Sequence, residues 1–296
     1  MNVTTNNQWR GYAFVLLGCA FWGTIGVFVK LMGNCGSTSE LTSFLRMFFA
    51  FLIMLVITIV KDGVGAFKIE KRAMLACALL GLICQGIYNV CYSLAVMKAG
   101  VSVGAILLNV APVFTAILSL MLFREKIGLK KWTSIVLKIA GCLLASGAFA
   151  VLNTKGATLS GILFGVAAGC CYALTPILSK IAGKQVNVFV MSTYSYLFAA
   201  LFLGIATKPW TANAITNPKV LGLGVLFALI PTAIGYVLYY EGVNQITETS
   251  KVPVFASSET VFAIIFGILI FQESFGFVNG IGILLIFISI IFIEFL

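Results

Sequence analysis

The chain has 296 residues, of which 61% are hydrophobic and only 9% are charged, and its formal net charge is +10. Soluble domains are roughly half apolar and about a quarter charged, so this composition excludes a water-soluble monomer. The apolar stretches are continuous rather than alternating, which argues against a transmembrane β-barrel. We therefore predict an all-α membrane protein, because helices satisfy their own backbone hydrogen bonds in lipid.

Ten apolar runs are long enough to cross a hydrocarbon core about 30 Å thick. The first run is followed by nine more, so it is not expected to be a cleaved signal peptide. In chain order the predicted spans are 11–32, 40–60, 73–97, 101–123, 132–152, 159–181, 187–206, 220–240, 251–271 and 275–296.

Basic residues alternate between the short loops, which favours a topology signal over nucleic-acid binding. The excess on one side predicts that both termini are cytoplasmic and that the protein is a multi-pass protein of the cell inner (plasma) membrane. The residues on that side are Arg10, Lys61, Lys68, Lys71, Arg72, Arg124, Lys126, Lys130, Lys131, Lys180, Lys184 and Lys251. Those on the opposite side are Lys30, Lys98, Lys155, Lys208 and Lys219.

The residue inventory also excludes several kinds of chemistry. Histidine is absent, which removes His metal ligands, general bases and triads. The eight cysteines form no CxxC pair, and all but Cys35 lie in apolar runs, so we interpret them as packing residues. No Walker motif or acid pair is present. We expect no cofactor, no metal site and no enzymatic activity.

An internal repeat relates the two halves of the chain at an offset of 148 residues, which aligns 86–128 with 234–276 without gaps. We predict two five-helix repeats, residues 1–155 and 156–296. Because five is odd, the second repeat would enter the membrane from the opposite side, as in many transporters. The identical pairs are Tyr88/Tyr236, Tyr92/Tyr240, Ser102/Ser250, Val113/Val261, Phe114/Phe262, Ile117/Ile265, Phe123/Phe271, Glu125/Glu273 and Gly128/Gly276.

One motif occurs twice in register. Residues 111–125 read APVFTAILSLMLFRE, and residues 259–273 read ETVFAIIFGILIFQE. With Phe-Trp-Gly at 21–23 and Arg46, these residues resemble the ten-helix EamA family of the drug/metabolite transporter superfamily. The resemblance implies a membrane permease, often an exporter of small metabolites. Thr260 departs from the family pattern, which has proline there, so a proline kink is not implied in the second copy.

Polar and aromatic residues form a stripe on the third span. Gln85, Tyr88, Asn89 and Tyr92 follow i, i+3, i+4, i+7 spacing and should share one helix face. The equivalent stripe on the eighth span contains Thr232, Tyr236 and Tyr240, with Tyr239 beside it. Such groups need partners in lipid, so the stripes predict a substrate cavity lined from both halves. The alternative is hydrogen bonding between helices.

Glu259 is the strongest single candidate for a functional residue, because placing an ionised carboxylate near the middle of a membrane span costs about 2.5 kcal/mol or more. It could bind a cationic group of the substrate or carry a coupling proton. The alternative is a buried acid or salt bridge that fixes helix packing. Helical spacing places Glu259 with Val252, Phe255 and Phe262 rather than squarely with Ser257, so the spacing leaves open whether it faces a cavity.

Other positions have both a functional and a structural interpretation. Asn109 and Ser257 occupy polar faces of spans four and nine. Pro112 and Pro253 in the same spans free backbone carbonyls and are candidate hinges, or simple packing kinks.

Trp22 and Tyr172 occupy equivalent places in spans one and six, and form either aromatic cavity walls or packing anchors. Arg46 could bind a substrate carboxylate, although a structural role is favoured for it, and Arg46 and Lys138 could both snorkel to an interface. Glu125 and Glu273 end their helices as structural markers, or as gates.

The function predicted from these features is secondary active transport of small organic metabolites, with export as the expected direction. Amino acids or similar amphipathic metabolites are the first choice of substrate. The alternative is an organic-cation transporter, choline-like or for drugs, with an aromatic cavity and Glu259. A passive channel is the remote alternative. The expected partners are a small-molecule substrate and membrane lipids, with no nucleic acid, and the chain is a monomer or homodimer.

Overall fold

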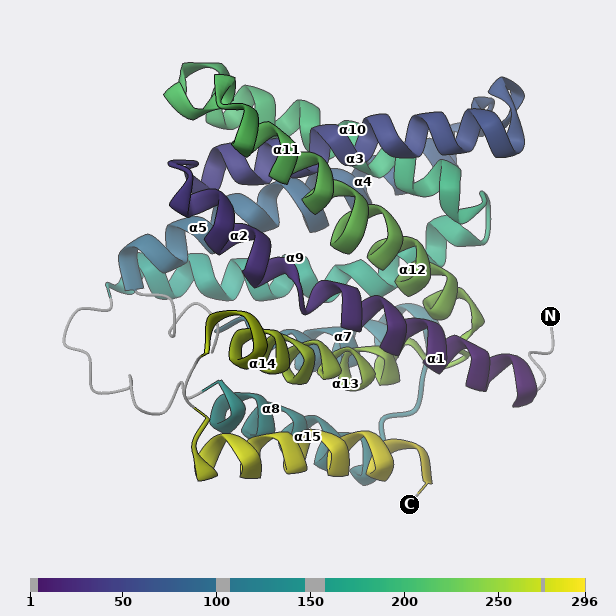
Figure 1. Cartoon of the computed structure of the whole chain (residues 1–296). Helices are drawn as coiled ribbons and strands as arrows, with labels where there is room; N and C mark the ends of the chain where they lie inside the picture. Colours follow the sequence, from purple (N-terminus) through teal and green to yellow (C-terminus); the bar gives the residue numbers. More distant parts are fainter. Residues whose placement is uncertain (1–4, 100–106, 147–157, 273–274, 296) are drawn as a thin grey trace.

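The computed structural model describes residues 5–99, 107–146, 158–272 and 275–295, and within them every element is helical (Figure 1). The helices of the first half are α1 (Thr5–Trp22), α2 (Ile25–Asn34), α3 (Ser39–Asp62), α4 (Lys71–Gly81), α5 (Tyr88–Ala99), α7 (Ala111–Phe123) and α8 (Leu129–Ala145). Those of the second half are α9 (Leu159–Gly183), α10 (Val188–Thr207), α11 (Pro218–Phe227), α12 (Gly235–Gln245), α13 (Val252–Ala256), α14 (Ser258–Phe271) and α15 (Phe277–Phe295).

Eight helical segments in the described residues are long and apolar enough to cross a membrane, and they confirm a multi-pass bundle. They are Gln8–Asn34, Ser39–Asp62, Lys71–Val96, Leu159–Gly183, Val188–Thr207, Pro218–Gln245, Thr249–Phe271 and Phe277–Glu294. The fourth predicted span is described over residues 107–123, which include α7 with 13 residues, and the fifth over residues 132–146, which lie mostly in α8 with 17 residues. Their remaining parts, and the predicted boundary at 155/156, lie outside the described residues.

Side-chain burial suits a lipid environment. Exposed side chains on the outside of the bundle include large apolar ones such as Met121, Leu163 and Leu284. Many serine and threonine side chains are fully buried instead, for example Ser192 and Thr193. Lipid tails are as apolar as leucine, so small polar residues hold the helices together inside while leucine-rich faces meet the lipid.

The helix contacts have the two-fold pattern expected of an inverted repeat. The most extensive contacts join the halves: α1 packs on α12, α5 on α9, α3 on α10, and α8 on α15. The first two contacts are equivalent under the repeat, because spans one and eight pair as spans three and six do. The start of α1 and the end of α15 lie toward one end of the bundle, to the right in Figure 1, and the α2–α3 turn lies at the other end. The two-repeat fold is therefore confirmed.

Helix irregularities also repeat. A π-helical segment precedes α5 at η2 (Leu82–Ile87), and another precedes α12 at η6 (Ala228–Ile234), at nearly equivalent positions. Span four is interrupted at Asn109–Val110, and span nine at the equivalent Ser257. Such interruptions often mark functional sites, because they redirect side chains and free backbone groups.

The proline prediction needs one correction. Pro112 and Pro253 do not sit inside continuous helices, because each occupies the first turn of a new helix, α7 or α13. The missing N–H has no helical partner in a first turn, so proline is tolerated there without a kink. Their role as hinges stays a prediction.

Candidate functional site

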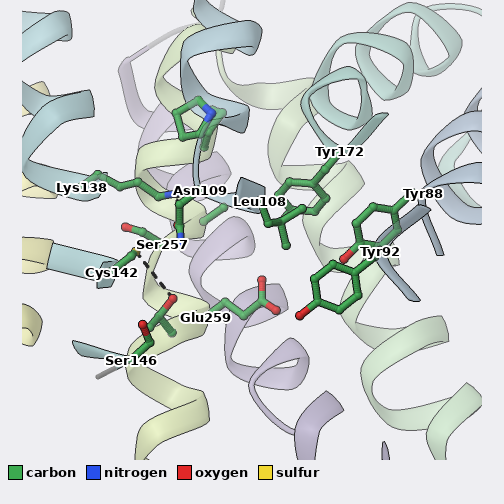
Figure 2. A pocket seen from close by; sticks show the side chains of 14 residues that line it. Tyr88, Tyr92, Leu108, Asn109, Lys138, Cys142, Ser146, Tyr172, Ser257 and Glu259 are labelled. Carbon is green, nitrogen blue, oxygen red and sulfur yellow. Dashed lines mark hydrogen bonds between the residues drawn. The ribbon is translucent and has the colours of Figure 1, made fainter. Parts of the chain in front are cut away.

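A cavity of about 580 Å³ lies between the two halves, and we call it the main cavity. A smaller one of about 190 Å³, the side cavity, adjoins it (Figure 2). Both are lined by Tyr88, Tyr92, Leu108, Tyr172 and Glu259. The main cavity adds Trp22, Asn89, Arg46, Phe227 and Tyr236 among others. The side cavity adds Asn109, Pro112, Lys138, Pro253 and Ser257 among others.

Aromatic rings form much of the cavity wall. Tyr88 lies 5.7 Å from Tyr172 and 6.0 Å from Tyr92, measured between ring centroids. Trp22 lies 4.5 Å from Tyr236 and 4.5 Å from Tyr239, and its own side chain is fully buried. These contacts hold the rings in place, so the wall is preorganised to contact an apolar or cationic group.

Arg46 is buried in the main cavity instead of reaching an interface. Its Nε donates to Thr232 Oγ1 at 2.9 Å, and its Nη2 donates to Tyr236 OH at 3.5 Å. The guanidinium also lies 5.0 Å from the centre of the Phe227 ring. Thr232 belongs to η6, so the π-helical turn of the second half positions a cation of the first half. The possibility that Arg46 snorkels is wrong for this residue.

Lys138 and Glu259 add two more charges to the cavities. Lys138 Nζ donates to Asn109 Oδ1 at 3.0 Å and is likewise buried. Glu259 points into the cavity toward Tyr88 and Tyr92 in Figure 2. The interruption at Ser257 breaks the regular helical spacing, so Ser257 and Glu259 line the side cavity together. The question that the spacing left open is thereby answered: Glu259 faces the cavity.

Three of the residues predicted to bind substrate lie behind the wall instead of in it. Gln85 is buried and its Nε2 donates to Tyr240 OH at 3.4 Å. Tyr239 packs against Trp22. Gln85, Tyr239 and Tyr240 are absent from the described lining of both cavities. The predicted single stripe therefore fails at Gln85, because the wide π-turn over Leu82–Ile87 rotates it away from Tyr88.

The end of the bundle that carries the chain termini is closed by contacts between the halves. The Glu125 carboxylate accepts hydrogen bonds from Thr249 N at 2.6 Å, from Ser250 N at 3.0 Å and from Ser250 Oγ at 2.6 Å. Glu125 ends span four, and the two donors begin span nine. A carboxylate at a helix start is favoured by the unpaired N–H groups and by the helix dipole.

Ion pairs extend this closure. Lys131 Nζ lies 3.0 Å from Glu248, Lys251 Nζ lies 3.2 Å from Glu248, and Lys251 Nζ lies 2.8 Å from Glu294. Partial burial alone would raise the pKa of Glu248, but the two ammonium groups lower it overall, so the acid stays ionised. Together with Glu125, Thr249 and Ser250, these residues are called the terminus-side network. The equivalent Glu273 and Ser102 lie outside the described residues.

The main cavity extends toward the opposite end of the bundle. Its lining there includes Val29, Val96 and Glu40, together with the exposed Ser39 at the start of α3. No residue of the terminus-side network lines either cavity in the described part of the chain. Within the described residues, the main cavity therefore extends to the end away from the termini and is separated from the other end by the terminus-side network.

The same residues bear on metal binding. Within the described ranges no three His, Cys, Asp or Glu side chains gather closely enough to hold a metal ion. The charged groups that line the two cavities are instead two buried cations, Arg46 and Lys138, and two carboxylates, Glu40 and Glu259, with several phenols around them. Charged groups and phenols of this kind can bind and orient a polar organic molecule.

Sequence comparisons cover almost the whole chain. A protein of Archaeoglobus fulgidus named an uncharacterized transporter is 28% identical over 92% of this chain and 92% of its own. The uncharacterized transporter YwfM of Bacillus subtilis is 22% identical over 95% and 92%. An uncharacterized transporter of Clostridium kluyveri is 27% identical over 95% and 91%.

A solved crystal structure with 13% sequence identity shares the fold, with a TM-score of 0.80 over 98% of this chain and 97% of that one. The sequence model of the EamA-like transporter family matches twice, at residues 9–147 and again at 159–295. The relatives and the family are transporters, in keeping with a cavity between inverted repeats. The chain thus belongs to the EamA-like transporter family.

Proposed function

We propose that the protein is a secondary active transporter that moves small organic metabolites by alternating access around the main cavity. One observation carries this proposal: inverted repeats enclose a charged, aromatic cavity that, in the described residues, extends to one end of the bundle and is separated from the other end by contacts between the halves. Rocking the repeats would break the terminus-side network and open the cavity toward the termini. Inverted repeats supply the equivalent contacts for closing the other end.

Amino acids and similar amphipathic metabolites are the proposed substrates, since the wall combines tyrosines with a small number of charges. The second candidate is an organic cation, choline-like or a drug. It is favoured by Glu259 facing Tyr88 and Tyr92, because tyrosine faces attract cations. A passive channel is the remote third reading.

The proposed location is the inner (plasma) membrane, with both termini cytoplasmic, a small-molecule substrate and lipid partners, no nucleic-acid partner, and a monomer or homodimer as the working unit. In this orientation the main cavity, in the described residues, extends toward the side away from the cytoplasm. Export is the proposed direction, driven by a proton gradient or by the gradient of the substrate itself.

Transport by purified protein in liposomes tests the function. We expect saturable uptake of at least one solute from a panel of labelled amino acids and amines, and faster uptake when unlabelled solute is present inside. Such trans-stimulation is the property of a carrier, because the loaded carrier returns faster than the empty one. Saturation without trans-stimulation would indicate a channel. If the protein neither moves nor binds any solute of the panel, the proposal is contradicted.

Glu259 is the proposed site of proton coupling. In Glu259→Gln we expect substrate accumulation driven by a pH gradient to fall at least about tenfold, a change of about 1.4 kcal/mol. The reason is that the neutral amide cannot bind and release a proton as the carboxylate does. Exchange at saturating substrate without a pH gradient should continue. The measurement is transport against pH, with the exposed Glu70→Gln as a matched control. An unchanged rate and pH profile in Glu259→Gln would remove the residue from coupling.

A further inference from the structure

Arg46 has donors that the protein does not use. A guanidinium carries five N–H groups, and only two hydrogen bonds from Arg46 reach described residues, to Thr232 and Tyr236. No ion pair joins Arg46 to an acid among these residues. A buried cation normally needs a counter-charge. Because Arg46 lines the main cavity and is held in place by its two partners, its free edge is preorganised for a carboxylate.

Glu259 is an acid of the same cavity, opposite in charge to Arg46. Its carboxylate faces both cavities, yet no hydrogen bond or ion pair to it occurs among the described residues. The phenols of Tyr88 and Tyr92 stand opposite it. The other cation of the cavities, Lys138, is held by Asn109 in the side cavity. The main cavity thus presents Arg46 and two acids, Glu259 and, toward the end away from the termini, Glu40, and no ion pair joins Arg46 to either acid among the described residues.

The separation between the positive charge of Arg46 and the negative charge of Glu259 determines which pattern of charges a ligand should carry. A ligand with only a cationic group would satisfy Glu259 and leave Arg46 without a counter-ion, and a simple carboxylate would do the reverse. Either leaves a buried or half-buried charge without a counter-ion, which is costly. A dipolar molecule compensates both charges at once, while its apolar part contacts the ring faces of Tyr88, Tyr172 and Trp22.

We infer that the main cavity is a zwitterion site, in which Arg46 binds the carboxylate and Glu259 the ammonium group of an α-amino acid with an apolar side chain. The inference rests on the proposed function and specifies the substrate class of the same cavity. It favours the amino-acid candidate over the organic cation. It also gives Arg46 a direct binding role.

Three probes with one common ring test the inference in liposomes of the full chain. They are phenylalanine, phenethylamine, which lacks the carboxylate, and 3-phenylpropionate, which lacks the ammonium group. We expect phenylalanine to bind at least about tenfold more tightly than either analogue, as measured by inhibition of transport, because each charged contact is worth a factor of this order. Leucine serves as a second zwitterion.

Two variants should then lose selectivity in opposite directions. Arg46→Gln should bind phenylalanine and phenethylamine about equally, whereas Glu259→Gln should bind phenylalanine and 3-phenylpropionate about equally. A merely structural role would weaken all probes together, and thermal unfolding identifies a variant that fails to fold. If Glu259→Gln does not fold, Glu259→Asp, which keeps the charge, should retain the wild-type order of the probes.

Two outcomes overturn the inference and are distinguishable. If the liposomes move phenethylamine or choline at least as well as every amino acid, transport stands and the zwitterion site is wrong. The same holds if simple carboxylates are preferred. If no solute of the wider panel moves or binds, the proposed function itself fails, and the assignment of Arg46 and Glu259 fails with it.

Discussion

Removal of the Glu125 carboxylate should open the cavity toward the chain termini. Glu125→Ala deletes the acceptor of three hydrogen bonds from the start of span nine. Hydrogen bonds to charged groups contribute about 1.5–3 kcal/mol each, and about 1.4 kcal/mol already changes an equilibrium tenfold. The equilibrium between the state closed at the terminus side and the state open at that side should therefore shift at least about tenfold toward the open state.

Thiol labelling measures this shift. Ser257→Cys places a thiol in the side cavity, beyond the terminus-side network. A membrane-impermeant reagent added from the terminus side should label position 257 at least about tenfold faster in the Glu125→Ala background, as read by peptide mass spectrometry. The matched control is Glu70→Ala, because Glu70 is an exposed acid that directly precedes α4 and makes no side-chain capping bond. Equal labelling rates in the two backgrounds would contradict a closing role for Glu125.

A single methyl group at Gly81 should destabilise the bundle strongly. A Cβ at this position would lie 2.1 Å from the Ser195 carbonyl oxygen, because α4 and α10 approach each other there through their backbones. Ser195 Oγ also donates to Cys77 O at 3.3 Å across the same contact. Backbone atoms cannot move aside as a flexible side chain can. Gly81→Ala should therefore cost about 3 kcal/mol, at the upper end of overpacking effects.

Thermal unfolding in detergent checks this expectation against a matched variant. Gly222 is exposed within α11, and a Cβ there would meet no atom within 4 Å. Gly222→Ala should therefore be neutral or stabilise by about 0.5–1 kcal/mol, because alanine is the better helix former. The prediction fails if Gly81→Ala unfolds at the wild-type temperature. It also fails if the two variants lose equal stability.

The glycine spacing on span six shows which kind of helix contact a local sequence pattern can predict. Gly161, Gly165 and Gly169 recur every four residues, and this tandem GxxxG spacing predicts a close helix contact within the bundle. The structure confirms it, since the first approaches Ala99 and the other two approach Leu107. A GxxxG face requires only regular helix geometry, so sequence spacing is sufficient. The π-turn at Leu82–Ile87 breaks that regularity, which is why the same reasoning misplaced Gln85.

The sequence by itself determined the membrane bundle, its inverted repeats and its family, because apolar run length and internal duplication are properties of the linear chain. It also singled out Glu259, since an acid within an apolar run is conspicuous wherever it points. Only the tertiary structure decided that Glu259 faces the cavity, that Thr232 and Tyr236 hold Arg46, and that Glu125 caps span nine. Those contacts join residues more than 100 positions apart, and helix interruptions set their directions, so no local spacing encodes them.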